Sequence, residues 1–331
     1  MYPLRFQPIF RRYIWGGHRL ATVLDKPIGD ESCAESWEIV DHNEDQSVVQ
    51  FGEFAGKSLA DLISNHGVEL LGESAYELIR DESIPEQLRG RFPLLLKFLD
   101  ANRSLSVQVH PDDVLGATLD PPDLGKTEAW YVMHADPGAK IYAGLKEGVT
   151  KEQLRNAIHD GSTEEMLHSF EPNAGDCVFI KAGTLHAIGE GLLIAEIQQA
   201  SDTTFRVFDW NRVDKDGTPR QLHIEESLEA TNFELGPVDP VDPVATEFEN
   251  ATTIVTSDKF EMRRWTLNQP IEFNDEKLRI VAVTKGSVKL SHDPSDEPLT
   301  MGQTAIIPAS CQSVSIQPME NSEVLDICLP Y

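Results

Sequence analysis

The chain has 331 residues, a formal net charge of −27 at pH 7 and 40% hydrophobic residues. This length suits two domains with real cores, and the acidic balance excludes proteins that bind nucleic acid through a basic face. No segment is apolar and long enough to span a bilayer or to act as a signal peptide, so we expect no membrane partner.

The cysteines bear on the compartment. Cys33, Cys177, Cys311 and Cys328 are scattered without any CxxC spacing. This pattern argues against a zinc ribbon or a disulfide framework and favours a reducing compartment, so we expect a cytoplasmic protein.

The acidic net charge also has a consequence for the substrate. An anionic substrate would be repelled by most of the surface and would need a local cluster of cationic side chains.

The first half of the chain mixes strands with one helical region. Residues 1–55 have the texture of short strands and turns, and residues 57–90 carry apolar positions at helical spacing, which predicts two or three short helices. The run FPLLLKFLD is almost continuously apolar and predicts a strand buried on both faces. Further on, Thr150 is suited to cap a helix that extends to about Asp160.

The second half reads as strands in two groups. Residues 170–212 repeat short β runs with glycine-rich turns, which is typical of a barrel or jelly roll. The stretch GPVDPVDPVA, which begins at Gly236, has three prolines and no periodicity, and the strand pattern returns after it. We therefore predict a mainly β fold with two β-barrel (jelly-roll) modules and a few short helices. The first module covers 1–236, a linker covers 237–245, and the second module covers 246–331.

Two stretches of the chain echo one another. PNAGDCVFIKAGTLHAI (172–188) and LTMGQTAIIPASCQSVSI (299–316) each contain a glycine turn, an apolar strand, a break of small residues and another strand. The first copy has His186 after the break, whereas the second has Gln312 near the corresponding place. We expect the second module to carry no chemistry.

The segment SVQVHPDD, residues 106–113, points to a site. Residues in a strand alternate between faces, so Val107 and Val109 share one face while Ser106, Gln108 and His110 share the other. Pro111 ends the strand because proline cannot donate to the ladder. A polar row facing a barrel interior is costly to bury without partners, which indicates a metal or another ligand at this strand end.

Four candidate metal ligands lie on or beside predicted strands of the first module: Gln108, His110, Glu128 and His186. Each alone is more simply explained as a structural histidine or a solvated polar residue. Together they form a set of histidine and carboxylate ligands that suits zinc, iron or manganese, and the residue types do not distinguish among these metals.

Several blocks resemble a known family. PIFRRYIWGG with ESWE, FPLLLKFLDANRSLSVQVHPDD, GKTEAWYV, AGTLHAIGEG and FRVFDWNR resemble, in order, the type I phosphomannose isomerases, in their short bacterial form. The resemblance covers residues 1 to about 235 and is looser afterwards. It implies cupin-like barrels and a metal-dependent enzyme that interconverts mannose 6-phosphate and fructose 6-phosphate, with one Zn2+ per chain.

The resemblance also implies roles for individual residues. The metal ligands of the family fall on Gln108, His110, Glu128 and His186, and its active-site arginine falls on Arg206. Its phosphate-facing positions fall on three polar or basic residues, Ser106, Lys126 and Arg212, of which the last is a lysine in longer relatives.

The chemistry agrees with this assignment. Aldose–ketose isomerisation through a cis-enediol moves a proton between C1 and C2 and builds negative charge on O1 and O2, which a divalent metal or Arg206 can stabilise. We expect Arg206 and Lys126 to be catalytic, and Ser106, Lys97 and Arg212 to bind substrate, although Lys97 could equally be a packing lysine. The general acid or base stays open among Lys97, Lys126, Glu196 and a metal-bound water.

Two other functions stay open. The chain could be a non-catalytic cupin that binds a sugar phosphate, or an isomerase of another sugar phosphate. In each case the partner is a small molecule, and the sequence does not determine the physiological metal or the oligomeric state.

Overall fold

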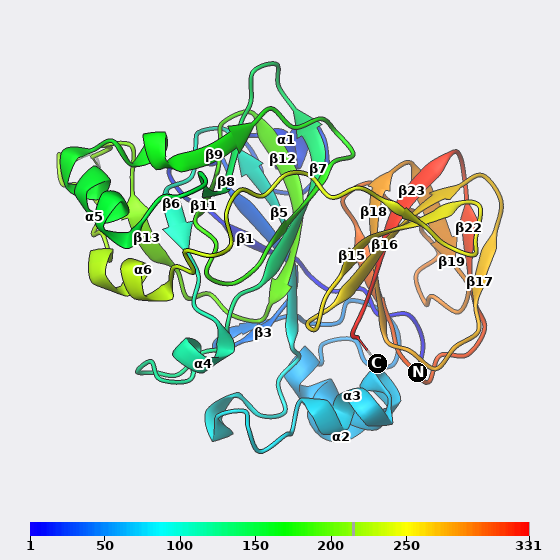
Figure 1. Ribbon diagram of the computed structural model, residues 1–331. Coiled ribbons are helices and arrows are strands. Elements are labelled where there is room, and N and C mark those ends of the chain that lie inside the picture. Colours follow the sequence, from blue (N-terminus) through cyan, green and yellow to red (C-terminus); the bar gives the residue numbers. More distant parts are fainter. Residues whose placement is uncertain (214–215, 331) are drawn as a thin grey trace.

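The computed structural model describes residues 1–213 and 216–330. Among these residues most strands form four antiparallel sheets. The sheets are stacked as four layers that follow one another from left to right in Figure 1. We number the sheets in that order. No helix of the described residues is long and apolar enough to cross a membrane.

The first two sheets hold most of the strands of the first 210 residues. Sheet 1 has the spatial order β13 (Phe205–Phe208), β6 (Val107–Val109), β11 (His186–Ile188), β8 (Ile141–Leu145) and β9 (Leu167–Phe170). Sheet 2 has the order β1 (Ile9–Arg11), β2 (Glu35–Ile39), β5 (Leu94–Ala101), β12 (Leu192–Gln199), β7 (Glu128–Ala135) and β10 (Cys177–Ile180).

The other two sheets hold the C-terminal strands. Sheet 3 has the order β14 (Val244–Ala245), β15 (Ala251–Thr256), β16 (Glu261–Leu267), β23 (Ser322–Cys328), β18 (Arg279–Lys285) and β21 (Thr304–Ile307). Sheet 4 has the order β17 (Ile271–Phe273), β22 (Val314–Pro318), β19 (Ser287–Leu290) and β20 (Leu299–Thr300). A small ribbon joins β3 (Asp41–His42) to β4 (Asp45–Gln46).

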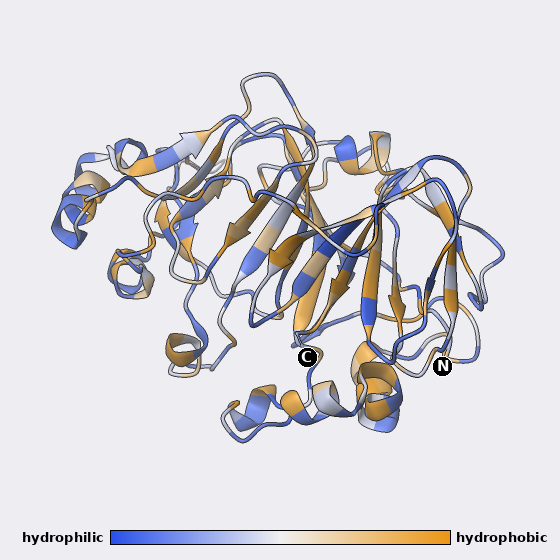
Figure 2. Cartoon of the chain, turned by 45° about the vertical axis from the view of Figure 1, so that its right-hand side comes forward, coloured by the Kyte–Doolittle hydropathy of each residue, from blue (hydrophilic) through white to orange (hydrophobic). Residues whose placement is uncertain are grey.

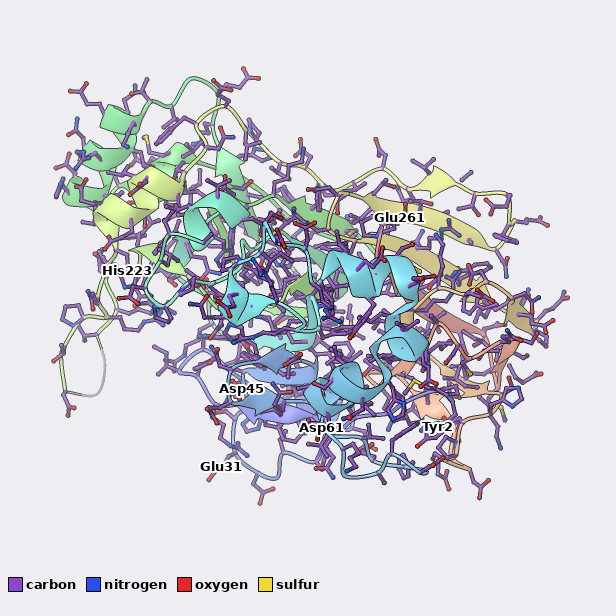
Figure 3. All side chains as sticks on the ribbon, turned by 90° about the horizontal axis from the view of Figure 1, so that it is seen from below. Tyr2, Glu31, Asp45, Asp61, His223 and Glu261 are labelled. Carbon is purple, nitrogen blue, oxygen red and sulfur yellow. The ribbon has the colours of Figure 1, made fainter. Side chains whose placement is uncertain are left out.

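Short helices cover the edges and the outer face of the sheets. They are α1 (Arg19–Thr22), α2 (Leu59–Leu71), α3 (Glu73–Leu78), η1 (Glu86–Leu88), α4 (Asp113–Gly116), α5 (Lys151–Asp160), η2 (Thr163–Met166) and α6 (Ile224–Ala230). Helix α2 begins with a capping box between Ser58 and Asp61, and Figure 3 shows this side of the molecule from below, with Asp61 labelled. Helix α5 begins after Thr150, which caps it as predicted.

Sheet 2 is buried on both faces, which explains its apolar sequence. All eight residues of β5 are buried. Phe98 packs in the core shared with sheet 3, whereas its neighbour Leu99 packs in the core shared with sheet 1. A strand covered on both sides needs apolar residues at odd and even positions alike, as the run FPLLLKFLD provides. Figure 2 shows much of the hydrophobic colour on these central strands.

The predicted linker does not hang free. Val238 donates its backbone N–H to Ala143 in sheet 1, and Val241 donates to Cys177 in sheet 2. Its last two residues, Val244 and Ala245, form strand β14. The chain therefore crosses to sheet 3 while bonded to the first two sheets. All four cysteines are buried and unpaired.

Candidate metal centre and cleft

Three of the predicted ligands meet in the space between sheets 1 and 2. His110 directly follows β6, Glu128 begins β7 and His186 begins β11. All three are buried, and one ligand atom from each lies within 4.8 Å of the others. The polar row of strand β6 faces this space as predicted, because Val107 and Val109 pack on the opposite side with Leu228 of α6.

Backbone carbonyls orient both imidazoles. Nδ1 of His110 lies 2.9 Å from the carbonyl oxygen of Thr203, and Nδ1 of His186 lies 2.9 Å from that of Thr184. A carbonyl oxygen can only accept, so each Nδ1 carries a proton and each Nε2 offers a lone pair. The Nε2 atoms lie 3.6 Å and 3.4 Å from the carboxylate of Glu128. Histidine ligands of metals are commonly held in this way.

The charges of the triad favour a bound cation. Burial and the nearby Lys126 lower the pKa of His110 well below its usual value, and burial lowers the pKa of His186 to about 4. Both rings are therefore neutral at pH 7. Nε2 of His110 and both carboxylate oxygens of Glu128 are buried without a hydrogen-bond partner. A divalent ion would satisfy these atoms, so the residues fit a metal.

The ionised form of Glu128 is only weakly stabilised by its neighbours. Burial and the neighbouring Glu196 raise the pKa of Glu128 to about 7. The nearest cationic group is the ammonium of Lys126, 3.4 Å from Oε2. A carboxylate in this position is readily ionised only when another positive charge is close.

Gln108 lies beside the triad. Its side-chain Nε2 is 3.2 Å from Nε2 of His186, and the two residues are register partners across β6 and β11. Ligation by Gln108 would use Oε1, which a half-turn of the amide places where the nitrogen lies.

A cleft of about 330 Å³ opens beside the triad. Five of the predicted site residues line it: Lys97, Ser106, Gln108, Lys126 and Arg206. The sequence analysis did not assign a role to most of the others, which are Tyr13, Trp15, Glu35, Leu99, Leu105, Ile188, Glu196, Asp202, Thr204 and Arg220. Arg220 could have been noticed as one more basic residue near FRVFDWNR in an acidic chain, but nothing local indicated that it faces the cleft.

Lys97 is held between two carboxylates. Its Nζ lies 2.9 Å from Glu196 on the neighbouring strand and 3.7 Å from Glu35. Burial opposes its charge, but these carboxylates raise the pKa of Lys97 above its usual value. Burial also opposes ionisation of Glu196, yet Lys97 and Lys126 lower the pKa of Glu196. The pair is therefore an ammonium and a carboxylate at neutral pH.

Arg206 projects from β13 beside Gln108, its register partner on β6. Its Nη1 donates to the carbonyl of Gln221 at 2.9 Å, and its backbone N–H donates to Nδ1 of His223. Its Nε is buried and has no hydrogen-bond partner. The guanidinium is thus fixed on one side and has donor capacity left for a ligand.

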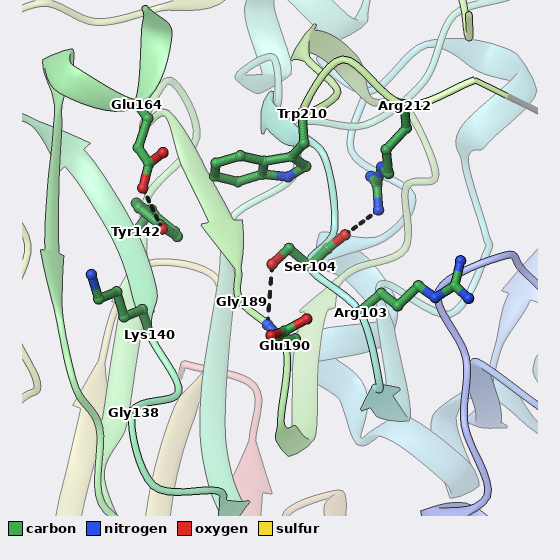
Figure 4. Close-up of a pocket in the computed structure, with 10 residues that line it drawn as sticks. All are labelled: Arg103, Ser104, Gly138, Lys140, Tyr142, Glu164, Gly189, Glu190, Trp210 and Arg212. Atoms are coloured by element: carbon green, nitrogen blue, oxygen red, sulfur yellow. Dashed lines mark hydrogen bonds between the residues drawn. The ribbon is translucent and has the colours of Figure 1, made fainter. Parts of the chain in front are cut away.

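Arg212 is not brought to this cleft. It lines a neighbouring pocket of about 530 Å³, where Figure 4 shows it pointing to the backbone of Ser104. Its guanidinium donates to the carbonyl of Ser104 and to Asp209. Arg212 therefore lines the pocket next to the cleft and not the cleft itself.

Comparison with known proteins identifies the family. The curated mannose-6-phosphate isomerase of Streptococcus mutans is 36% identical over 94% of each chain, and mannose-6-phosphate isomerase ManA of Bacillus subtilis is 34% identical over 92% of this chain and 93% of that one. The chain belongs to the type I phosphomannose isomerase family. Family models match at residues 3–126 (phosphomannose isomerase type I, catalytic domain) and 250–320 (mannose-6-phosphate isomerase, cupin domain).

Solved structures agree with the fold of this phosphomannose isomerase family member. The crystal structure of the mannose 6-phosphate isomerase from Bacillus subtilis has a TM-score of 0.86 and 30% identity, with 99% of each chain covered. A mannose 6-phosphate isomerase bound with zinc and yttrium has a TM-score of 0.78 at 17% identity, covering all of both chains. At that identity the second match supports the fold alone.

Asp123 holds the loop that orients His110. It accepts hydrogen bonds from the hydroxyls of Ser201, at 2.9 Å, and Thr203, at 2.7 Å, and it contacts His42. Burial opposes its ionisation, but hydrogen bonds with His42 and Thr203 lower the pKa of Asp123 to about 2. The ionised form is therefore stabilised by the folded state.

This shift predicts a pH-dependent loss of stability in Asp123→Asn. A carboxyl whose folded pKa lies below its unfolded value stabilises the fold above about pH 4, by roughly 2 kcal/mol here, and loses this contribution as pH falls towards 2. In urea titrations the difference between wild type and Asp123→Asn should shrink from pH 7 to pH 3. A difference that is the same at both pH values would contradict the prediction.

Proposed function

We propose that this protein is a metal-dependent mannose-6-phosphate isomerase that interconverts mannose 6-phosphate and fructose 6-phosphate through a cis-enediol. The observation that carries the proposal is the buried triad of His110, Glu128 and His186 beside a cleft lined by cations. Membership of the isomerase family supports the same activity.

We propose zinc, one ion per chain, as the metal. His110, Glu128 and His186 would hold it, with Gln108 as a fourth ligand after its amide rotates. Two neutral imidazoles and a carboxylate are a common donor set for catalytic zinc. When bound, such an ion supplies Lewis acidity towards sugar oxygens or holds the sugar chain in place. The zinc-bound relative is consistent with this choice.

The side chains of the cleft would divide the remaining work. Arg206 offers donors to the oxygens that gain negative charge in the enediol. Lys97 keeps its proton between two carboxylates and is unsuited to act as a base. The ionised Glu196 is better suited to accept the proton, and Lys126 adds positive charge near the reacting end. Ser106 and Lys97 would contact the substrate.

The C-terminal sheets would carry no chemistry, because an ion pair fills the corresponding place. Glu128 pairs in register with the last residue of β10, Ile180, and Arg279 pairs with the last residue of β21, Ile307. The neighbouring strands correspond as well. Asp326 lies two residues before the partner of Arg279 on β23, just as Glu196 lies two residues before the partner of Glu128 on β12. Arg279 and Asp326 are buried and lie 2.6 Å apart, so the second position holds its own cation.

His110→Ala tests the metal site. We expect the metal content, measured by mass spectrometry after dialysis against zinc, to fall from about one ion per chain to near zero while the circular dichroism spectrum persists. A matched control is His159→Ala, since His159 lies in the last turn of helix α5. Full occupancy in His110→Ala would contradict the assignment.

A coupled assay tests the activity. Wild-type protein stripped of metal should be inactive towards mannose 6-phosphate and should regain turnover with zinc. Binding of the sugar phosphate without turnover by the zinc-loaded protein would instead favour a non-catalytic binding protein. Turnover of a different sugar phosphate only would favour another isomerase.

A further inference from the structure

The cleft contains an arginine with no assigned role, Arg220. It lines the cleft together with Lys97, Lys126 and Arg206, whereas Arg212 lines the neighbouring pocket. Both Arg212 and Arg220 bind the same carboxylate, that of Asp209. The structure thus places two arginines around one acid and directs only one of them into the cleft.

Each of the three guanidinium nitrogens of Arg212 donates to the protein. Its Nε donates to the carbonyl of Asp209, its Nη1 to the carbonyl of Ser104, and its Nη2 to the Asp209 carboxylate. These bonds join the segment after β13 to the loop before β6. Arg212 therefore links two segments of the chain, and three of its five N–H donors are used by the protein, against two of those of Arg220.

Arg220 is held by one edge only. Its Nε donates to Oδ2 of Asp209 at 2.8 Å, and its Nη2 donates to Oδ1. Among the described residues no partner is found for Nη1. The side chain of Arg220 is 29% exposed while that of Asp209 is 6% exposed. A two-point contact with a buried carboxylate fixes the guanidinium plane and leaves its other edge for a second anion.

The charges of the cleft favour an anion at Arg220. Two guanidiniums and one carboxylate leave the group of Arg212, Asp209 and Arg220 with net positive charge. The two lysines of the cleft already have carboxylate partners: Lys97 has two carboxylates and Lys126 has Glu128. The remaining cation, Arg206, lies beside Gln108 at the metal end of the cleft. A dianion that enters a protein of net charge −27 needs such a local positive group.

We propose that Arg220 binds the phosphate of the substrate and that Asp209 is its positioning residue. The inference rests on the proposed function, because it assigns the phosphate end of the same cleft. Arg220 touches a group whose charge does not change during the reaction. Its contribution therefore belongs to binding, not to the chemical step.

The test compares Arg220→Ala with Arg212→Ala. For Arg220→Ala we expect KM for mannose 6-phosphate to rise by about 10- to 100-fold with kcat nearly unchanged, as for the loss of a charged hydrogen-bond donor. Inorganic phosphate, titrated calorimetrically into metal-free protein, should lose affinity by a similar factor. Arg155→Ala, which removes an exposed arginine paired with Glu225 on the helical face, is the matched control and should leave both values unchanged.

Asp209→Asn tests the positioning role. This change removes the charge that anchors Arg220 but leaves Arg220 in the chain, so KM should rise less than in Arg220→Ala and the double variant should add little to Arg220→Ala. Full additivity of the two changes would refute the positioning role. If Arg220→Ala does not fold, the same measurements of KM, kcat and phosphate affinity on Arg220→Gln test the inference.

The outcomes separate this inference from the proposed function. If the zinc-loaded wild type turns over but Arg220→Ala keeps its KM, or loses kcat alone, Arg220 does not bind the phosphate. A larger rise of KM in Arg212→Ala would also overturn the inference. If phosphate binding depends on Arg220 while the wild type has no isomerase activity, the anion site stands and the proposed function fails.

Discussion

Arg206→Ala should lower kcat for mannose 6-phosphate by about 10²–10³-fold and change KM little. Its guanidinium lies in the cleft beside Gln108 and retains a buried Nε without a partner. A donor held in place before the reaction stabilises charge that appears only in the transition state. Its removal therefore affects the chemical step more than binding.

Two variants make this measurement decisive. Arg206→Lys keeps the charge but lacks the planar fork, so it should recover only part of kcat. Arg80→Ala removes an exposed arginine beyond helix α3 and should behave as wild type. Steady-state kinetics on zinc-loaded protein provide both constants. An increase of KM alone in Arg206→Ala would make Arg206 a phosphate-binding residue and would remove its proposed catalytic role.

Much of the candidate metal site could be predicted because its signals are local. The alternation around Gln108 placed Val107 and Val109 on the packed face and the polar row on the other, as the structure has it. A strand reveals its buried face through its own sequence, since neighbouring side chains point to opposite sides. The run at Phe98 and Leu99 likewise indicated a strand with cores on both faces.

The substrate end of the cleft could not be predicted in the same way. Arg212 and Arg220 both follow β13, and neither position has a periodic pattern that indicates its direction. Their directions depend on Asp209, which binds both, and on Ser104, which lies more than a hundred residues earlier and accepts from Arg212. Contacts between distant segments decide such a site, and no local propensity encodes them.

The packing of sheet 2 against sheet 3 also could not be predicted from the sequence. The N-terminal segment pairs with a C-terminal strand, since Leu4 and Ile306 exchange backbone hydrogen bonds. Arg5 binds Asp293 in the same region. The patterns of both modules predicted strands. They did not predict that sheet 2 packs against sheet 3, because a sheet that is apolar on both faces shows no alternation from which its packing partner could be inferred. The echo at Gln312 indicated a module without chemistry, while the buried pair of Arg279 and Asp326 was not evident.

The buried ion pair of Arg279 and Asp326 leads to a second prediction with a large effect, on the free energy of unfolding. Arg279→Ala should reduce the free energy of unfolding by about 3–5 kcal/mol, because it leaves the carboxylate of Asp326 buried without its cation. Asp326 is 1% exposed and lies 2.6 Å from Nη1 of Arg279. The guanidinium also lies 4.1 Å from the ring centroid of Phe273, so the loss includes packing. Urea titration followed by circular dichroism measures the change.

The double variant Arg279→Met with Asp326→Leu separates charge from packing. Replacing both partners by apolar side chains of similar size is often neutral or stabilising, so the double variant should recover most of the stability that Arg279→Ala loses. An equally unstable double variant would show that the ion pair itself holds the sheets. Because Arg279 lies on sheet 3, far along the chain from the cleft residues, both variants should keep wild-type kcat and KM at temperatures where they are folded. A fall of kcat in the folded double variant would instead assign the C-terminal sheets a part in the reaction.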